Sequence, residues 1–270
     1  MPRVNAGGVN LYYERIGEGI PFILHGHNHM WYMPFQVPYF SQFYDVIVHD
    51  RRGTGRSDDP PGPWTAADLA LNIKKLMDAL DIPKAIVGGI SLGGVVSSQF
   101  GLDYPDRAHA LLVTGTIPRL WPLGAQWIAD QIAMTERDEP PIVMQPRSYD
   151  WEAEGPPTTA PAFVESPMGR YVGTLDNGLG SKEAIIKMVN VLAQWDQRPR
   201  YPELKTLDVP ALVMVGGNEP QKTIEYSYEW HVQFKNSDYV ILPNTHHNAG
   251  IENPIGWNTA AHGFLKRHGF

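Results

Sequence analysis

Short runs of apolar residues, separated by polar turns, dominate the first and last thirds of the chain. Such runs between turn residues are typical of strands buried on both faces of a parallel sheet. The segment from Val9 to Glu14 instead alternates apolar and polar positions, which predicts an edge strand. Buried strands are predicted at residues 21–24, 44–49, 85–88, 110–114, 210–216 and 238–242.

Helical spacing of apolar positions appears between these strands. Thr65 is placed to begin one helix, whose apolar face carries Leu69, Ile73, Leu76, Met77 and Leu80. Further helices are predicted at residues 95–104, 182–194 and 255–268. This β-α-β-α order predicts an α/β protein with a mostly parallel central sheet and helices on both faces.

The pattern changes between the strands at 110–114 and 210–216. This stretch is rich in Pro between residues 140 and 167, carries Trp121, Trp127 and Trp151, and lacks strand signals. An insertion of this size between two sheet strands is best interpreted as a cap over the carboxyl edge of the sheet. We therefore expect a core formed by residues 1–117 and 202–270, and a cap, or lid, formed by residues 118–201.

Composition narrows the class of protein. The chain has 270 residues and is 43% hydrophobic, enough for one large α/β domain. A net charge of −7 and the lack of a basic cluster argue against nucleic-acid binding. Without cysteine the chain has neither disulfides nor thiolate chemistry. No apolar leader or membrane-spanning run is visible, so we expect a cytoplasmic protein without membrane contact.

The residues Gly89-Ile90-Ser91-Leu92-Gly93 lie between a predicted strand and a predicted helix. In that setting the pattern G-x-S-x-G predicts a nucleophile elbow, which lifts a serine hydroxyl clear of the carboxyl edge of the sheet. The amide groups at the start of the following helix then lie near the hydroxyl, where they can face a developing negative charge.

A serine hydroxyl needs a base to become a nucleophile, and the base needs a carboxylate to orient it. The partners are expected later in the chain, at the ends of other strands. Glu219 is the sole acid in the loop after the strand at 210–216. The loop after the strand at 238–242 contains His246 and His247, so each partner is predicted at the same sheet edge as Ser91.

These motifs resemble the α/β-hydrolase superfamily over nearly the whole chain. His25-Gly26-His27 is similar to its oxyanion loop, and Asp50 to Ser57 is similar to its D-x-R-G-x-G-x-S segment. The ending G-H-x4-E-x-P places the catalytic histidine five residues before Glu252, which selects His247 over His246. The acid is Glu219 where the family more often has Asp, and whether His246 has a role stays open.

The resemblance also implies an oxyanion hole made by the backbone N–H groups of His27 and Leu92. A glutamate acid occurs in some metal-independent lactonases of the superfamily, including those acting on N-acyl homoserine lactones, and residues 112–118 resemble that branch. We expect neither a metal nor a cofactor. Trp31, Trp121, Trp127 and Trp151 are candidate substrate-binding residues.

The expected function is hydrolysis of a small to medium apolar ester or lactone by a serine hydrolase that forms an acyl-enzyme. Ser91 would be the nucleophile, His247 the proton shuttle and Glu219 the residue that orients it. Two alternatives stay open. One is a carbon–carbon bond hydrolase of the meta-cleavage type, and the other is a hydrolase-like receptor for small molecules. The sequence leaves the oligomeric state open.

Overall fold

The computed structural model describes residues 2–26, 28–120, 122–137, 161–175 and 180–270. Eight strands form one sheet in the order β1-β2-β4-β3-β5-β6-β7-β8, in which β2 is antiparallel to its neighbours β1 and β4 and all other pairs are parallel. The strands are β1 (Arg3–Asn5), β2 (Asn10–Ile16), β3 (Pro21–His25), β4 (Asp45–His49), β5 (Ala85–Ile90), β6 (Ala108–Thr114), β7 (Ala211–Gly216) and β8 (Ser237–Leu242). The prediction of an α/β-hydrolase fold is confirmed.

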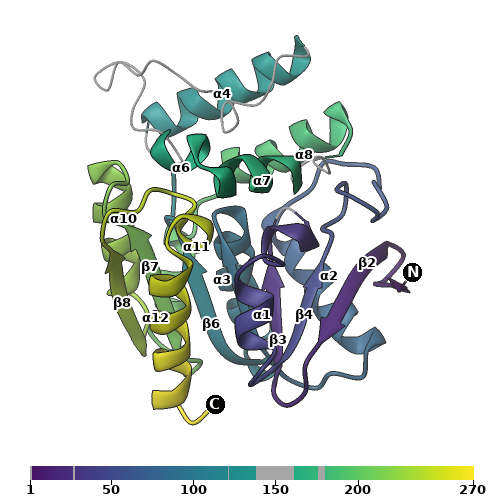
Figure 1. Cartoon of the computed structure of the whole chain (residues 1–270), viewed down its shortest axis with the longest axis vertical. Coiled ribbons are helices and arrows are strands. Elements are labelled where there is room, and N and C mark those ends of the chain that lie inside the picture. Colours follow the sequence, from purple (N-terminus) through teal and green to yellow (C-terminus); the bar gives the residue numbers. More distant parts are fainter. Residues whose placement is uncertain (1, 27, 121, 138–160, 176–179) are drawn as a thin grey trace.

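Helices cover both faces of the sheet (Figure 1). One face carries α2 (Ala66–Ala79), α3 (Leu92–Asp103) and α10 (Gln221–His231), whereas α1 (Gln36–Phe40) and α12 (Pro254–Arg267) pack on the other. We call the apolar layer under α2, α3 and α10 the first core and the layer under α1 and α12 the second core. Successive residues of β3 point to opposite faces, so Ile23 lies in the first core and Phe22 and Leu24 lie in the second. Shorter elements are η1 (His29–Trp31), η2 (Pro105–Arg107), η4 (Arg198–Arg200), α9 (Tyr201–Leu204) and α11 (Ala249–Glu252).

The predicted strands and helices agree with the structure to within a few residues, with one correction. β2 was expected at the edge of the sheet, but β1 pairs with its outer side. β1 has only three residues, Arg3–Asn5, which is too short for a recognisable alternation. Thr65 is the N-cap of α2 as predicted, and it forms a reciprocal capping box with Asp68.

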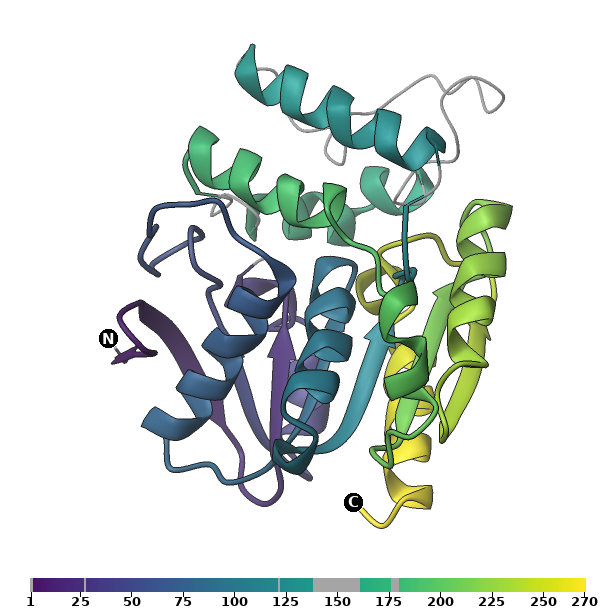
Figure 2. The same ribbon diagram turned by 180° about the vertical axis from the view of Figure 1, so that it is seen from behind.

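Among the described residues between β6 and α9, four α-helices lie above the carboxyl ends of the strands (Figures 1 and 2). They are α4 (Pro122–Glu136), α6 (Pro161–Glu165), α7 (Pro167–Leu175) and α8 (Lys182–Ala193). We call them the cap helices, while the boundaries 118–201 stay a prediction. Within the described ranges, no helix combines the length and apolar character needed to cross a membrane.

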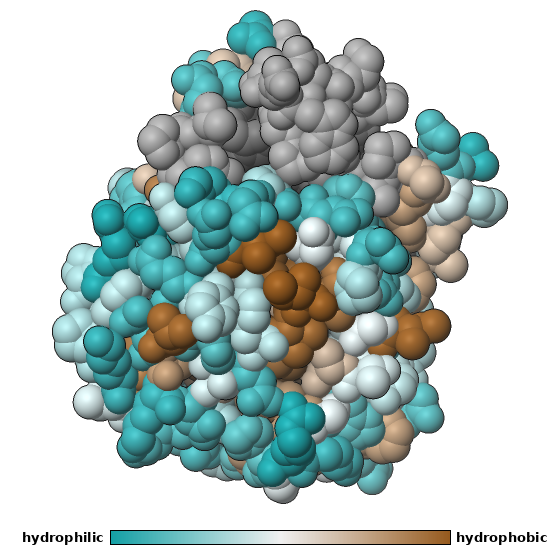
Figure 3. Space-filling view, turned by 90° about the vertical axis from the view of Figure 1, so that its left-hand side faces the viewer, coloured by the Kyte–Doolittle hydropathy of each residue, from teal (hydrophilic) through white to brown (hydrophobic). Residues whose placement is uncertain are grey.

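The face beside β8 carries apolar surface near its centre (Figure 3). β8 is the outer strand on this side of the sheet, and its Ile241 is about half exposed. Val232 after α10 and Ile255 in α12 are also exposed large apolar residues. By contrast, the central strands β3 to β7 are almost entirely buried, so the carboxyl ends of these strands form a rigid support for a site.

Candidate active site

Ser91 stands at the sharp turn between β5 and α3. Its backbone has φ 58° and ψ −122°, a conformation that residues other than glycine rarely adopt and that is often found at functional sites. A side chain at Gly89 or Gly93 would overlap the carbonyl oxygen of His25 at the end of β3. The two glycines therefore allow β3 to pack directly against the turn that presents Ser91.

Glu219 and His247 meet through a hydrogen bond. His247 Nδ1 lies 3.0 Å from Glu219 Oε1, and the Glu219 side chain is only 4% exposed. The loops that carry them are joined by the backbone, since Asn218 N–H donates to Thr245 O at 2.9 Å. Because a carboxylate accepts, Nδ1 of His247 carries the proton and Nε2 is left as the basic nitrogen.

The backbone after β6 links this pair to Ser91. Ser91 N–H donates to Thr114 O at 2.8 Å, and the next residue, Gly115, has φ 55°. A Cβ at Gly115 would lie 3.0 Å from His247 O and 3.4 Å from Glu219 Oε1. The structure thus joins His247 to Glu219 directly, and it ties Ser91 to that pair through residues 114 and 115.

The surroundings of His247 favour its protonated form. Burial by itself would lower the pKa of His247, but the charge of Glu219, its hydrogen bond and the charge of Glu252 raise that pKa above its ordinary value. His246 instead contacts Glu252, with Nδ1 3.2 Å from Oε2, and its backbone N–H donates to the same oxygen at 3.1 Å. The two histidines therefore have separate carboxylate partners, Glu219 for His247 and Glu252 for His246.

The other predicted site residues are described to different extents. Leu92 is buried and is the first residue of α3, so its N–H belongs to the first turn of that helix. Trp31 ends η1 and is partly buried against the second core. His27, Trp121 and Trp151 lie outside the described residues, and α4 includes Trp127, whose side chain is also outside the description.

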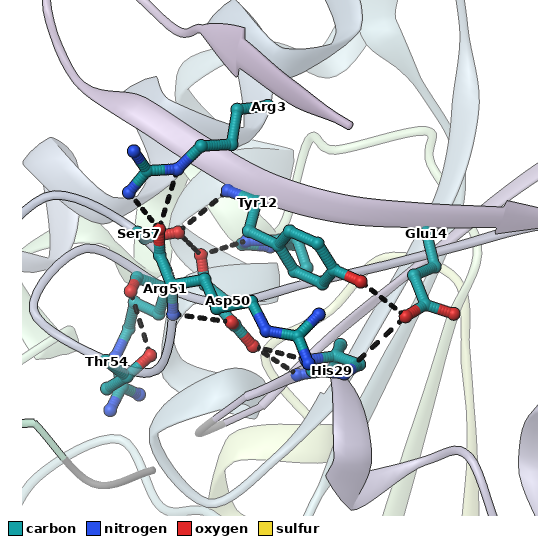
Figure 4. Close-up of polar contacts among 10 residues, drawn as sticks. Arg3, Tyr12, Glu14, His29, Asp50, Arg51, Thr54 and Ser57 are labelled. Atoms are coloured by element: carbon teal, nitrogen blue, oxygen red, sulfur yellow. Dashed lines mark hydrogen bonds and ion pairs between the residues drawn. The ribbon is translucent and has the colours of Figure 1, made fainter. Parts of the chain in front are cut away.

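A polar network that the sequence motifs did not predict surrounds Asp50, directly after β4 (Figure 4). Asp50 Oδ1 is 2.6 Å from His29 Nδ1 and accepts the His29 backbone N–H at 2.9 Å. On its other side His29 Nε2 lies 3.6 Å from Glu14 Oε1, which also accepts a hydrogen bond from Tyr12. Charged residues directly after a buried strand were the available signal for this network.

Asp50 is held in its ionised form by these contacts. Burial favours the neutral acid, but the hydrogen bonds from His29 and from Arg56 N–H lower the pKa of Asp50 below its ordinary value. Asp50 therefore fixes His29, in the segment after the predicted oxyanion loop, to the end of β4.

His25 and His49 form a buried pair of histidines at the ends of β3 and β4. His25 Nδ1 and His49 Nε2 are 2.9 Å apart, and both side chains are buried. Burial lowers the pKa of His49 to about 4, so the ring is neutral near pH 7. Across the described part of the chain, no three His, Cys, Asp or Glu residues are grouped as metal ligands would be.

Comparison with known proteins identifies the family of this chain. The model of the alpha/beta hydrolase family matches residues 22–258, and the chain belongs to this family. A curated relative, 3-oxoadipate enol-lactonase 2 of Acinetobacter baylyi, is 29% identical over 88% of this chain and 84% of its own length.

Two solved structures illustrate the shared fold. The enol-lactonase from Burkholderia xenovorans LB400 has a TM-score of 0.84 at 22% identity, covering 98% of this chain and all of its own. The meta-cleavage product hydrolase from Pseudomonas fluorescens IP01 has a TM-score of 0.74 at 20% identity, covering 99% of this chain and 98% of its own.

Proposed function

We propose that this chain is a serine hydrolase that cleaves carboxylic esters or lactones through an acyl-enzyme. The observation that carries the proposal is the hydrogen-bonded His247–Glu219 pair at the sheet edge where Ser91 stands in its strained turn. The family match and the enol-lactonase relative support hydrolysis as the type of reaction.

In the proposed mechanism Ser91 Oγ attacks the substrate carbonyl carbon while His247 Nε2 takes the hydroxyl proton. The π electrons of the carbonyl move onto its oxygen, and the N–H groups of His27 and Leu92 stabilise the charge that develops there. Collapse of the tetrahedral intermediate expels the alcohol, which takes the proton from His247. Water then attacks the acyl-enzyme by the same route, while Glu219 keeps the imidazole oriented and stabilises its charged form.

Replacing the nucleophile tests the proposal. Ser91→Ala should lower kcat for p-nitrophenyl esters by about 10³-fold or more while the fold is retained, since the oxyanion hole and binding alone give limited catalysis. The measurement is steady-state hydrolysis together with circular dichroism. Full activity in Ser91→Ala would contradict the mechanism.

The substrate class follows from the composition of the cap. Its Trp and Met residues suit an apolar wall, so we propose that neutral esters or lactones with apolar acyl groups are preferred. Burial of such a group contributes about 25 cal/mol of binding free energy per Å² of apolar surface removed from water. A panel of lactones and p-nitrophenyl esters of graded acyl length, compared by kcat/KM, measures this preference. Higher kcat/KM for short charged esters would contradict it.

Two other functions use similar residues. Cleavage of carbon–carbon bonds would need the same three side chains, and the likeness to the meta-cleavage hydrolase, at 20% identity, extends to the fold alone. Turnover of a vinylogous diketone, with esters left intact, would favour that function. A receptor would show a rise in melting temperature with lactones and negligible turnover.

A further inference from the structure

Arg51 is a buried cation directly behind the predicted oxyanion loop. It follows β4, its side chain is among the largest that are fully buried, and its Nη1 donates to the carbonyl oxygen of Gly26 at 3.3 Å. Its Nη2 contacts Met188 Sδ in the cap helix α8. The guanidinium therefore lies between the loop after β3 and the cap.

Gly26 is also confined on its other side. A Cβ at Gly26 would lie 2.9 Å from Cε2 of Tyr32, whose ring is buried. Tyr32 is fixed in turn, because its hydroxyl donates to His25 O at 3.0 Å and accepts from Ile90 N–H at 3.2 Å. Gly26 is thus held by two side chains. Tyr32, which is hydrogen-bonded to β3 and β5, packs against it, and Arg51 donates to its carbonyl oxygen.

Covalent geometry gives the contact of Arg51 a consequence. The carbonyl of one residue and the N–H of the next belong to the same planar unit and, in a trans peptide, point in opposite directions. Holding Gly26 C=O therefore constrains the peptide unit to which the donor of the proposed oxyanion hole belongs. A cation on the carbonyl oxygen also polarises the unit and strengthens that donor.

We propose that Arg51 is a positioning residue that holds the carbonyl group of Gly26 and so supports the oxyanion loop of the proposed mechanism. This inference rests on the proposed serine mechanism. It separates Arg51 from its neighbour Arg52, whose guanidinium contacts Asn72 Oδ1 and Asp68 O on the side of α2, away from the loop.

Variants at residue 51 test the role through the split between kcat and KM. Arg51→Met removes the donor at similar length, and we expect kcat for p-nitrophenyl esters to fall about 10- to 100-fold with KM within about twofold. Arg51→Gln keeps a neutral N–H donor, and its kcat should lie between that of the Met variant and that of the wild type. Arg51→Lys keeps a cationic donor and should recover most of the lost kcat.

A transition-state analogue supplies a readout that a purely structural role would leave unchanged. Ser91 Oγ adds to the carbonyl carbon of a trifluoromethyl ketone while its proton passes to His247 Nε2, and the displaced electron pair forms an oxyanion at the position of the reaction intermediate. The Ki of this inhibitor should rise in Arg51→Met by the same factor by which kcat/KM falls. An unchanged Ki would overturn the proposal.

Arg52→Met is the matched control, because it also removes a buried guanidinium next to β4. We expect it to lower the melting temperature while kcat stays within about twofold of wild type. Unchanged kcat in folded Arg51→Met would overturn the inference, as would a rise in KM alone. If Arg51→Met does not fold, the Gln and Lys variants decide by the same measurements.

The experiment also separates this inference from the proposed function. If kcat falls in Ser91→Ala but not in Arg51→Met, the inference about Arg51 is wrong and the serine mechanism stands. If kcat does not fall in Ser91→Ala, both the inference and the serine mechanism are wrong.

Discussion

At the scale of single residues, the chemistry of the proposed site depends on how His247 is charged. Its raised pKa comes from Glu219 and, more weakly, from Glu252, which together outweigh burial. A general base must be unprotonated, so activity should increase with pH through the pKa of His247. In the proposed mechanism Glu219 would thus both orient the base and set the lower pH limit of activity.

Glu219→Gln removes the charge and keeps the size of the side chain. We expect kcat to fall by about 10³- to 10⁴-fold, because the imidazolium loses its counter-charge and its tautomer is no longer fixed. The pKa of His247 should fall as well, since burial then dominates, and the rising part of the pH–kcat/KM profile should move to lower pH. A profile that stays in place would show that another carboxylate orients His247.

Glu252→Gln is the comparison for that experiment. Glu252 acts on His247 by charge alone and contacts His246 directly. We expect a shift of the profile in the same direction but smaller, with a much smaller loss of kcat.

At the scale of elements, the end of β3 is joined to β5 by Tyr32 from the turn after η1. The Tyr32 hydroxyl is bonded to His25 O and to Ile90 N–H, so one side chain connects the predicted oxyanion loop to the turn that carries Ser91. The relative position of these two loops therefore depends on a buried pair of hydrogen bonds.

Tyr32→Phe should leave a buried carbonyl and a buried N–H without this partner. We expect the free energy of unfolding to fall by about 2 kcal/mol, with a drop in kcat as the two loops loosen. Urea unfolding and ester hydrolysis measure the two effects. Tyr44→Phe is the matched control, because its buried ring loses only one long hydrogen bond, 3.4 Å, to Phe270 O.

The central strands and the turn at Ser91 could be predicted from the sequence because each carries a local signal. Apolar runs marked the central strands, and the glycines at 89 and 93 marked the turn at Ser91. Charges directly after a predicted strand marked Asp50 and Arg51, but their contacts with the loop after β3 could not be predicted, because these depend on the pairing of β3 with β4, which brings distant segments together. β1 was missed because three residues form no pattern.

At the scale of the whole molecule, burial of neutral histidine makes stability depend on pH. The pKa of His49 is about 4 in the folded protein, mainly because of burial, against about 6.5 in an unfolded chain. Between these values the unfolded state binds a proton that the folded state does not. The contribution is therefore complete above about pH 6.5 and is lost as the pH falls toward 4.

His49→Gln should flatten this dependence. We expect the wild type to lose up to roughly 3 kcal/mol of unfolding free energy from this group between pH 7 and pH 4, and the variant to lose less over the same range. Urea unfolding at a series of pH values measures both proteins. Parallel pH curves for the two proteins would contradict the assignment to His49.

Ser91, Glu219 and His247 stand at the ends of β5, β7 and β8, and β8 pairs only with β7 in the sheet. If the proposed mechanism holds, a chain synthesised only through β6 would contain the nucleophile but lack His247, the base that activates it. Reactivity would then begin only when β8 docks, and an incomplete or misassembled copy would be inactive. Labelling by an active-site probe would accordingly count finished molecules.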